Sequence, residues 1–236
     1  MENIMGHFKF PFIAKPVDDG CSSAVKKIKN KQELEAFAAL IFRKQEDLDE
    51  GAASLLKIKP KEEFPVKKSF LIEELIIAEK ADRFLEVTGG MITSYDDKGQ
   101  IVYELFDASE TLSEGDVLSL EEKFLAGQGQ NITPARYSKS YPESQVISEV
   151  VKKELEKAAR LLNIQGYARI DAFVRIYGQE KVEVVFIEVN SLPGMTPATC
   201  IFHQAALNNY KPYEFIDKIL DFGFKRKNRQ LENTKS

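Results

Sequence analysis

The stretch that decides the fold is Val185-Phe-Ile-Glu-Val-Asn-Ser-Leu-Pro-Gly-Met-Thr196. Side chains of a β-strand point alternately to its two faces, so Glu188 and Asn190 are predicted to share one face. The opposite face receives Val185, Ile187 and Val189. Asn is uncommon in strands, and the strand runs directly into Ser191–Pro197, a tight loop whose backbone N–H groups could reach a ligand. Both features favour a functional strand end.

A second strand is predicted shortly before this one, in Gly166-Tyr-Ala-Arg-Ile-Asp-Ala172. Alternation places Arg169 and Asp171 on one of its faces. Its other face receives Ile170, Ala172 and Val174. Residues 177–180 are typical of a turn, so the two strands are predicted to form an antiparallel hairpin. With an even number of loop residues, one face of this hairpin holds Arg169, Asp171, Glu188 and Asn190.

This hairpin face combines one guanidinium with three oxygen-bearing side chains. Mg²⁺ usually binds through one or two carboxylates plus substrate phosphates, so the pattern predicts a metal site. The alternative is a half-exposed hairpin with ordinary polar residues on its solvated face, since exposed strand faces are normally polar. Alternation alone does not decide between the two interpretations.

The composition of the chain excludes several classes of protein. Its 236 residues fit one large domain or two small ones, and its 43% hydrophobic and 30% charged residues are ordinary for a soluble protein. A net charge of -4 argues against non-specific nucleic-acid binding. No stretch has transmembrane length or the pattern of a secretory signal, so no membrane partner is expected. Only two cysteines, Cys21 and Cys200, indicate a reducing cytoplasm and argue against a zinc site.

Hydrophobic spacing predicts the main elements. A helix is clearest at Gln145–Leu162, with Ser144 as its cap, and another is predicted at Lys31–Gln45. A C-terminal helix is expected at Tyr213–Phe222, followed by a solvated basic tail. Asp47–Lys68 is charged and irregular, which is typical of a surface excursion or a poorly ordered loop. Strands are predicted at Phe10–Pro16, Ser69–Ile77, Arg83–Thr93 and Gln100–Phe106.

Nucleotide-binding motifs of the common kinds are absent from the sequence. Neither GxxxxGK[ST] nor a strand-linked GxGxxG occurs, so a nucleotide must be held in another way. Lys15 lies at a strand end beside a Gly/Ser loop, where its ammonium group could neutralise a phosphate. Glu73 begins a linker that could face an adenine edge, and Lys123 precedes a glycine-containing loop that could close as a lid. For Lys15 and Glu73 the alternative is an ordinary charged residue at a strand end.

Five motifs occur in a fixed order along the chain. They are Lys15-Pro16 with its small-residue loop, Ile72-Glu-Glu-Leu75, Glu122-Lys-Phe124, Ala168-Arg-Ile-Asp171 and Glu188-Val-Asn-Ser-Leu-Pro-Gly-Met-Thr196. Together they resemble the ATP-grasp fold, and specifically the D-alanine-D-alanine ligase family. The last two motifs are highly specific for this family, whereas the lysine and the glutamate of the first two are weak signals when taken singly. The resemblance covers the chain from Phe10 to Phe222.

The resemblance implies an α+β chain with the ATP-grasp fold, in which two subdomains with antiparallel sheets enclose the nucleotide. Residues 1–76 are expected to form part of the central subdomain, residues 77–225 the C-terminal subdomain, and residues 226–236 the basic tail. The N-terminal α/β domain of such ligases has no counterpart, so an excised fragment or a short relative that needs a partner is expected. The parent enzyme is expected to be a homodimer, and this chain mainly a monomer.

The resemblance also implies roles for individual residues. Asp171, Glu188 and Asn190 would hold two Mg²⁺ ions, or Mn²⁺, that bridge the phosphates of ATP. Arg169 and the backbone N–H of Gly194 would stabilise the tetrahedral transition state. The other expected contacts are to substrate, from Ser22 and Thr199, and to the nucleotide, from Lys15, Glu73, Glu74, Leu75, Ile76, Glu86 and Lys123.

In the reaction that the resemblance implies, ATP phosphorylates the carboxylate of one D-alanine, and the amine of a second D-alanine displaces the phosphate. The dipeptide serves peptidoglycan precursor synthesis in the cytoplasm. Two residues depart from the family pattern: Cys21 replaces a usual serine, and Phe124 replaces the tyrosine of dipeptide-forming relatives. In the family, phenylalanine at this position goes with acceptance of D-lactate as the second substrate. The alternative is that the replacement of tyrosine by Phe124 has no effect on substrate choice. Another carboxylate–amine ligase of this fold and a nucleotide-binding module without turnover are also open.

Overall fold

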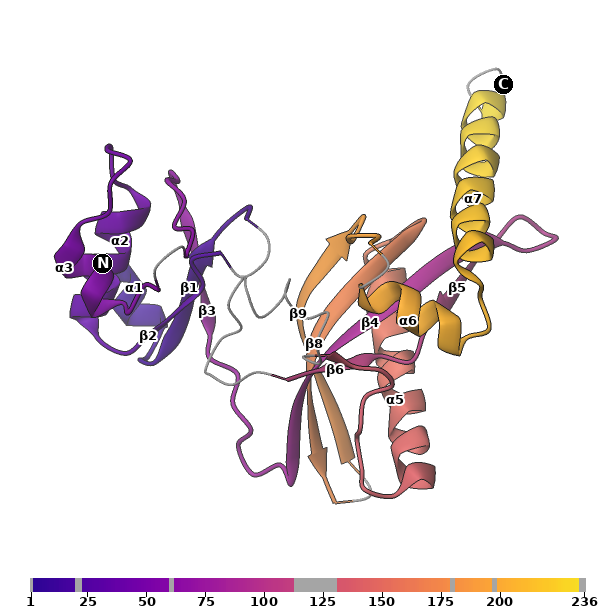
Figure 1. Ribbon diagram of the computed structural model, residues 1–236, viewed down its shortest axis with the longest axis horizontal. Helices are drawn as coiled ribbons and strands as arrows, with labels where there is room; N and C mark the ends of the chain where they lie inside the picture. Colours follow the sequence, from indigo (N-terminus) through magenta and orange to yellow (C-terminus); the bar gives the residue numbers. More distant parts are fainter. Residues whose placement is uncertain are drawn as a thin grey trace. The chain divides into compact units, whose positions relative to one another are not determined.

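The computed structural model describes residues 2–19, 23–59, 62–112, 131–178, 181–196 and 199–233. These residues form two compact units, each with a hydrophobic core of its own (Figure 1). Unit 1 contains the described residues up to Ile77, and unit 2 those from Ala78 onward. Both combine helices with antiparallel strands, which confirms the predicted α+β class. Among these residues, no helix is both long and apolar enough to cross a membrane.

Unit 1 contains a three-stranded antiparallel sheet in the order β2-β1-β3. Phe12 and Ala14 alternate along β1 and are buried in one cluster with Phe37 of α2. Asn30 caps α2, because its Oδ1 accepts a hydrogen bond from the Glu33 N–H at 2.9 Å. The elements of unit 1 are α1 (Glu2–His7), β1 (Phe12–Pro16), β2 (Lys26–Ile28), α2 (Lys31–Ile41), α3 (Glu50–Leu55) and β3 (Phe70–Glu74).

The charged stretch Asp47–Lys68, in contrast to the irregular surface segment that its composition predicts, contains a helix and two side chains that are buried in the core of unit 1. Helix α3 lies within it, and the Asp49 carboxylate caps α3 by accepting a hydrogen bond from the Ala52 N–H at 2.8 Å. Leu56 and Phe64 are buried against α2. The expectation was wrong because a few apolar side chains among many charges are enough to anchor a segment.

Unit 2 is built on a six-stranded antiparallel sheet in the order β7-β6-β4-β8-β9, with β5 paired to the far end of β4. The long central strands β4 and β8 pair from Arg83↔Ile176 to Ile92↔Tyr167. The elements of unit 2 are β4 (Arg83–Tyr95), β5 (Ile101–Leu105), β6 (Ser109–Thr111), β7 (Asn131–Ile132), α5 (Tyr141–Leu161), β8 (Tyr167–Tyr177), β9 (Lys181–Ser191), α6 (Cys200–Leu207) and α7 (Pro212–Asn233).

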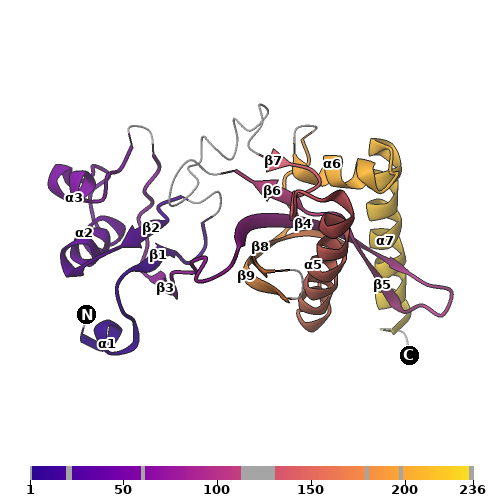
Figure 2. The same cartoon turned by 90° about the horizontal axis from the view of Figure 1, so that it is seen from below.

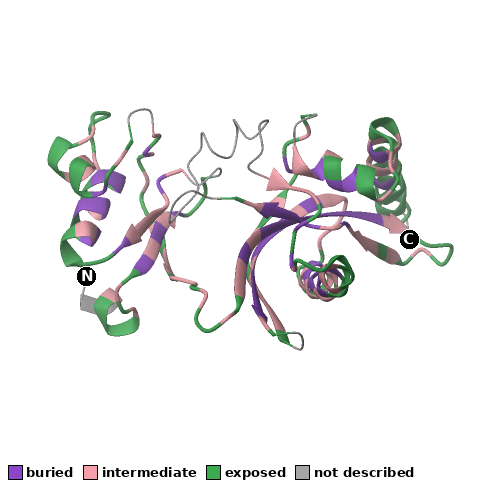
Figure 3. Cartoon of the chain, turned by 60° about the horizontal axis from the view of Figure 1, so that its bottom comes forward, coloured by how far each residue is buried: buried purple, intermediate pink, exposed green. Residues whose placement is uncertain are grey.

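Helices cover both faces of this sheet (Figures 2 and 3). Helix α5 packs on the face that carries Val87 and Ile170, and the strands and helix share one buried cluster. Helices α6 and α7 pack on the opposite face, around Ile92 and Phe215. The unit therefore has two cores, one on each side of a single sheet.

Two consecutive glycines let helices approach the central strand β4 closely from both faces. A Cβ atom on Gly89 would lie 2.4 Å from Leu155 Cδ1 of α5. A Cβ atom on Gly90 would lie 2.3 Å from Gln204 Oε1 of α6. Glycine in the interior of a strand often marks such a close approach.

Two helices differ from their predicted bounds. Helix α5 starts after Ser140, and Ser144, the predicted cap, instead accepts a hydrogen bond from the Tyr137 N–H at 3.2 Å. Helix α7 continues to Asn233, so residues 226–233, which were expected in a solvated tail, are helical. Within them, Arg229 Nη1 donates a hydrogen bond to the Gly99 carbonyl at 2.5 Å. This contact joins the extended part of the helix to the β4–β5 turn.

Candidate functional site

A β-bulge aligns the polar residues of the β8–β9 hairpin. The hairpin register leaves residues 178–180, an odd number, between the paired ends of the two strands. With that register alone, Asp171 would lie opposite Ile187. The register shift between Asp171 and Ala172 adds one residue to β9, so Asp171 pairs with Glu188 instead. The loop therefore lacks the even number of residues that would place the four polar residues on one face. The bulge restores that shared face.

The register set at the turn decides which valine faces the core. Val184 pairs with the buried Val174 and contacts the α5 cluster. Val185 pairs with Phe173, on the opposite face of the sheet. The prediction that Val185 lies on the face opposite Glu188 was wrong, because strict alternation is interrupted at the bulge between the two residues.

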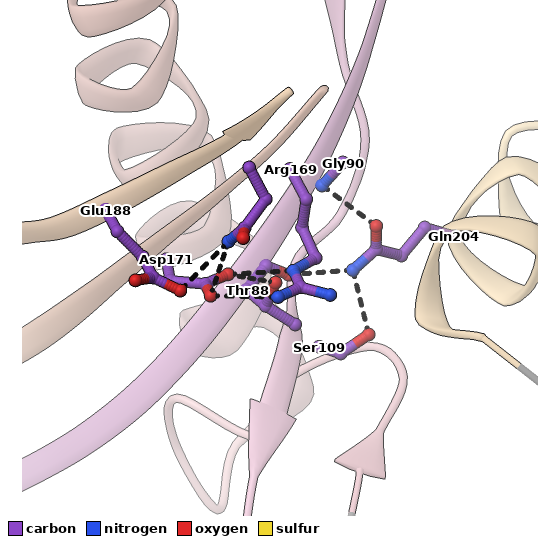
Figure 4. A network of polar contacts seen from close by, with 8 residues as sticks. Thr88, Gly90, Ser109, Arg169, Asp171, Glu188 and Gln204 are labelled. Carbon is purple, nitrogen blue, oxygen red and sulfur yellow. Dashed lines mark hydrogen bonds and ion pairs between the residues drawn. The ribbon is translucent and has the colours of Figure 1, made fainter. Parts of the chain in front are cut away.

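Asp171 is the centre of a hydrogen-bond network on the α6 face of the sheet (Figure 4). The residue is 7% exposed. Thr88 Oγ1 donates to Oδ1 at 2.5 Å. Arg169 contacts both carboxylate oxygens, from Nε at 3.0 Å and from Nη2 at 3.1 Å. Asn190 Nδ2 donates to Oδ2 at 3.1 Å. These donors hold the carboxylate in one orientation.

The amide of Asn190 lies between two carboxylates, because its Nδ2 also donates to Glu188 Oε1 at 3.1 Å. The three residues of the predicted metal set therefore meet at one point. A half-turn of the amide presents its oxygen there, which gives an all-oxygen donor set that fits Mg²⁺. Within the described residues no group of three His, Cys, Asp or Glu side chains could hold a metal, so this set depends on the amide.

Arg169 offsets the negative charge of Asp171. Burial lowers the pKa of Arg169, but the charge and hydrogen bonds of Asp171 outweigh it and raise the pKa above its ordinary value. Asp171 takes the Nε–Nη2 edge of the guanidinium, and a guanidinium has five N–H donors, so further donors are left for a ligand. Burial raises the pKa of the nearby Cys200 thiol, although the Arg169 charge opposes this shift. A neutral thiol is a poor nucleophile.

The remaining predicted residues of unit 2 lie around this network. Glu86 lies on β4 opposite Phe173, on the same face as Asp171. Gly194 lies in the loop after β9, where a Cβ atom would be 3.8 Å from Thr199 Cγ2. Thr199 precedes α6, and its hydroxyl donates to the Thr196 carbonyl at 2.7 Å.

Two predicted nucleotide residues contact each other in unit 1. Lys15 of β1 and Glu73 of β3 form an ion pair, with 2.8 Å between Nζ and Oε1. Glu74 ends β3, and the linker residues Leu75 and Ile76 follow it. The predicted residues Lys123 and Ser22 lie outside the described residues.

Sequence reasoning missed two residues that the network uses, Thr88 and Gln204. Gln204 is fully buried on α6 beside the apolar Ile201 and Ala205. Its side-chain amide forms hydrogen bonds with the backbone of β4 at Thr88 and Gly90 (Figure 4). A glutamine among apolar helix residues, together with a Gly-Gly pair inside a strand, was the available signal.

A family model described as D-ala D-ala ligase C-terminus matches residues 56–221. The chain belongs to this family. The D-alanine--D-alanine ligase of Leptospira interrogans is 30% identical over 221 residues, which are 92% of this chain and 50% of the relative. A D-alanine--D-alanine ligase of Caldicellulosiruptor bescii is 21% identical over 100% of this chain and 52% of its own length. The chain thus spans about half the length of the curated relatives it matches.

Solved structures support the same D-ala D-ala ligase fold. The D-alanine-D-alanine ligase from Coxiella burnetii matches with a TM-score of 0.61 and 13% identity, over 99% of this chain and 50% of that chain. The Bacillus anthracis enzyme complexed with ATP matches with a TM-score of 0.54 and 15% identity, over 96% of this chain and 56% of that chain. The family and the ATP-grasp fold predicted from the sequence motifs are confirmed.

Proposed function

We propose that this chain supplies the ATP- and Mg²⁺-binding part of a cytoplasmic ligase that joins D-alanine to D-alanine for peptidoglycan precursor synthesis. The observation that carries the proposal is the convergence of Asp171 and Glu188 on the amide of Asn190, beside Arg169. Membership of the family supports the choice of substrate. We take units 1 and 2 as the two subdomains of the ATP-grasp fold.

The residues of unit 2 have distinct parts in this proposal. Asp171, Glu188 and Asn190 would hold the Mg²⁺ ions, two by resemblance, whose charge offsets that of the ATP phosphates. Arg169 is fixed at one edge by Asp171 and directs further N–H donors toward negative oxygen atoms of the reacting groups. The backbone N–H of Gly194 acts in the same way, and Thr199 binds the carboxylate of the second substrate.

Two steps follow from these assignments. In the first, a carboxylate oxygen of one D-alanine attacks the γ-phosphorus of ATP, which gives an acyl phosphate and ADP. In the second, the amine of another D-alanine attacks the acyl carbon, inorganic phosphate leaves, and the amine loses a proton. Both steps increase negative charge on oxygen atoms, which is the charge that Arg169 and the Gly194 N–H stabilise.

The residues of unit 1 are assigned to the nucleotide. Lys15 would contact phosphate, the stretch from Glu73 to Ile76 would frame the adenine, and Glu86 of unit 2 would contact the ribose. Lys15 is paired with Glu73 here, and its ammonium group has three N–H donors, so donors are left for a phosphate oxygen. The parts of Lys123 and Ser22, and acceptance of D-lactate beside Phe124, stay predictions.

The proposal is tested by calorimetric titration of the chain with ATP, with and without Mg²⁺. Wild type is expected to bind ATP in a Mg²⁺-dependent manner, and Glu188→Gln is expected to weaken that binding at least about 10-fold through loss of a ligand charge. Glu183→Gln, on the same strand but paired with Arg175, is the matched control and should bind as wild type does. Mg²⁺-independent binding, or equal affinity of Glu188→Gln and wild type, would contradict the metal assignment.

A second measurement separates the ligase from the open alternatives. Phosphate release that depends on D-alanine supports the proposed reaction. ATP hydrolysis stimulated by a different carboxylate and amine supports another ligase of this fold. Metal-dependent ATP binding without phosphate release, even when an N-terminal ligase domain is added, supports a module without turnover.

A further inference from the structure

The edge of β4 is interrupted between its two partner strands. Strand β6 pairs with β4 up to Thr88, and β5 pairs with it only from Met91 onward. Between them, the Gly90 carbonyl accepts a hydrogen bond from the Phe106 N–H at 2.9 Å. The Gly90 N–H and the Thr88 carbonyl face the same edge, because they belong to residues two positions apart. Buried backbone groups of this kind need partners.

The side-chain amide of Gln204 supplies both partners. Its Oε1 accepts from the Gly90 N–H at 2.8 Å, and its Nε2 donates to the Thr88 carbonyl at 2.7 Å. The amide thus occupies the place of a missing peptide group in the ladder. Nε2 also donates to Ser109 Oγ, the first residue of β6, at 2.9 Å. Gln204 is 0% exposed, so these bonds are made away from water and define the position of the amide closely.

Thr88 connects this amide to the candidate metal site. Its carbonyl accepts from Gln204, and its hydroxyl donates to Asp171 Oδ1 at 2.5 Å. Helix α6, which carries Gln204, begins at Cys200 directly after Thr199. The buried amide of Gln204 therefore contacts Thr88, which holds Asp171, and it belongs to the helix that begins directly after Thr199.

We propose that Gln204 is a positioning residue that orients the Asp171 carboxylate through Thr88 and holds the Thr199–Cys200 end of α6 against the sheet. The first half rests on the proposed function, since it takes Asp171 as a metal ligand. The second half concerns the position of α6 and holds whatever the chain binds.

The first half is tested with Gln204→Met, Thr88→Val and the double variant. Gln204→Met keeps the bulk and removes the amide, and Thr88→Val removes the hydroxyl but keeps the carbonyl. Each single variant is expected to weaken Mg²⁺-dependent ATP binding about 10-fold, the scale found for residues that support metal ligands. The double variant is expected to be no weaker than the weaker-binding single variant, because both changes interrupt one connection.

A control variant distinguishes positioning from a general loss of stability. Ile201→Val removes a methyl group from the same buried face of α6 and leaves every hydrogen bond of Gln204 in place. It should bind Mg²⁺ and ATP as wild type does at a temperature where all variants are folded. Effects of Gln204→Met and Thr88→Val that multiply in the double variant would overturn the coupling through Thr88. Wild-type affinity in Gln204→Met would overturn it as well.

The second half is tested by alkylation of Cys200, a partly buried thiol at the start of α6, in a Cys21→Ser background. Gln204→Met is expected to raise the rate of reaction with iodoacetamide several-fold, whereas Thr88→Val and Ile201→Val leave it unchanged. An equal rate in Gln204→Met and Ile201→Val would refute this half. If wild type binds no ATP, the proposed function and the first half both fail, and the alkylation rates still decide the second.

Discussion

At the scale of single residues, Asp171 shows how a polar site is fixed by bonds from several elements. Its carboxylate receives donors from Thr88 on β4, Arg169 on its own strand and Asn190 on β9. No single neighbour sets its orientation. A carboxylate held in this way is organised before any ligand arrives, which lowers the cost of binding.

The ion pairs of Lys67 give a prediction about pH. Lys67 Nζ lies 2.9 Å from an Asp18 oxygen and 2.8 Å from an Asp19 oxygen. Hydrogen bonding to Lys67 lowers the pKa of Asp18 below 3.8, and hydrogen bonding to Asp19 raises the pKa of Lys67 above 10.5. The Asp18 contribution is therefore present above pH 3.8 and is lost as pH falls through its lower folded value. The Lys67 contribution is present below pH 10.5 and is lost as pH rises through its higher folded value.

We expect Lys67→Met to lower the stability of unit 1 at neutral pH, with a smaller effect at the acidic and alkaline extremes. Chemical unfolding of both proteins across pH measures this difference. Lys68→Met, at the exposed neighbouring position, is the matched control and should change stability little. Added salt should reduce the Lys67→Met effect, because the pair is open to solvent screening. A pH-independent difference would show that packing of the Lys67 stem, not charge, is responsible.

At the scale of elements, the β-bulge in the β8–β9 hairpin changes the strand register near the polar site and leaves the register near the turn as it was. It brings Glu188 opposite Asp171, whereas Val184, on the turn side of the bulge, keeps its place opposite Val174 in the cluster under α5. A bulge is a common device for re-aiming side chains beside functional sites. Here the extra residue in β9 lets Glu188 face the polar site while Val184 faces the core.

This register predicts unequal effects of truncating two adjacent valines. Val184→Ala should destabilise the chain by about 1–2 kcal/mol, because it removes two methyl groups that pack on the α5 cluster. Val185→Ala should cost less than about 1 kcal/mol, since Val185 lies on the other face. Urea unfolding of the two variants decides the matter. The reverse ranking would mean that the strand follows the simple alternation of its sequence.

At the scale of the whole molecule, each unit draws its core from its own residues. The aromatic centre of unit 1 is Phe37, whose ring lies 5.4 Å from that of Phe64 and 5.1 Å from that of Phe70. The corresponding centres of unit 2 lie on the two faces of its sheet. Separate cores predict that local unfolding can be confined to one unit.

We expect Phe37→Ala to destabilise unit 1 by about 3–5 kcal/mol and to leave unit 2 folded. Hydrogen exchange should show faster exchange in α2 and unchanged protection in β8. Leu155→Ala, in the α5 core of unit 2, is the reciprocal variant and should have the opposite pattern. Loss of protection in both units with either variant would show that they fold as one cooperative body.

The sequence by itself determined the strands, the hairpin and the ordered motifs from which the family and the ATP-grasp fold were predicted. These depend on local periodicity and residue type, which a chain carries before it folds. It also nominated Arg169, Asp171, Glu188 and Asn190, and the structure brings these four together.

How those residues come together depends on contacts between distant parts of the chain. Composition does not reveal the bulge that aligns Glu188, because register depends on the pairing of whole strands. Nor does it reveal that Gln204 completes the edge of β4, because residues 114 positions apart in sequence meet there through packing. Nor does it reveal that Arg229, in the extended part of α7, contacts the β4–β5 turn. Local pattern specifies the elements, and contacts between elements specify the site.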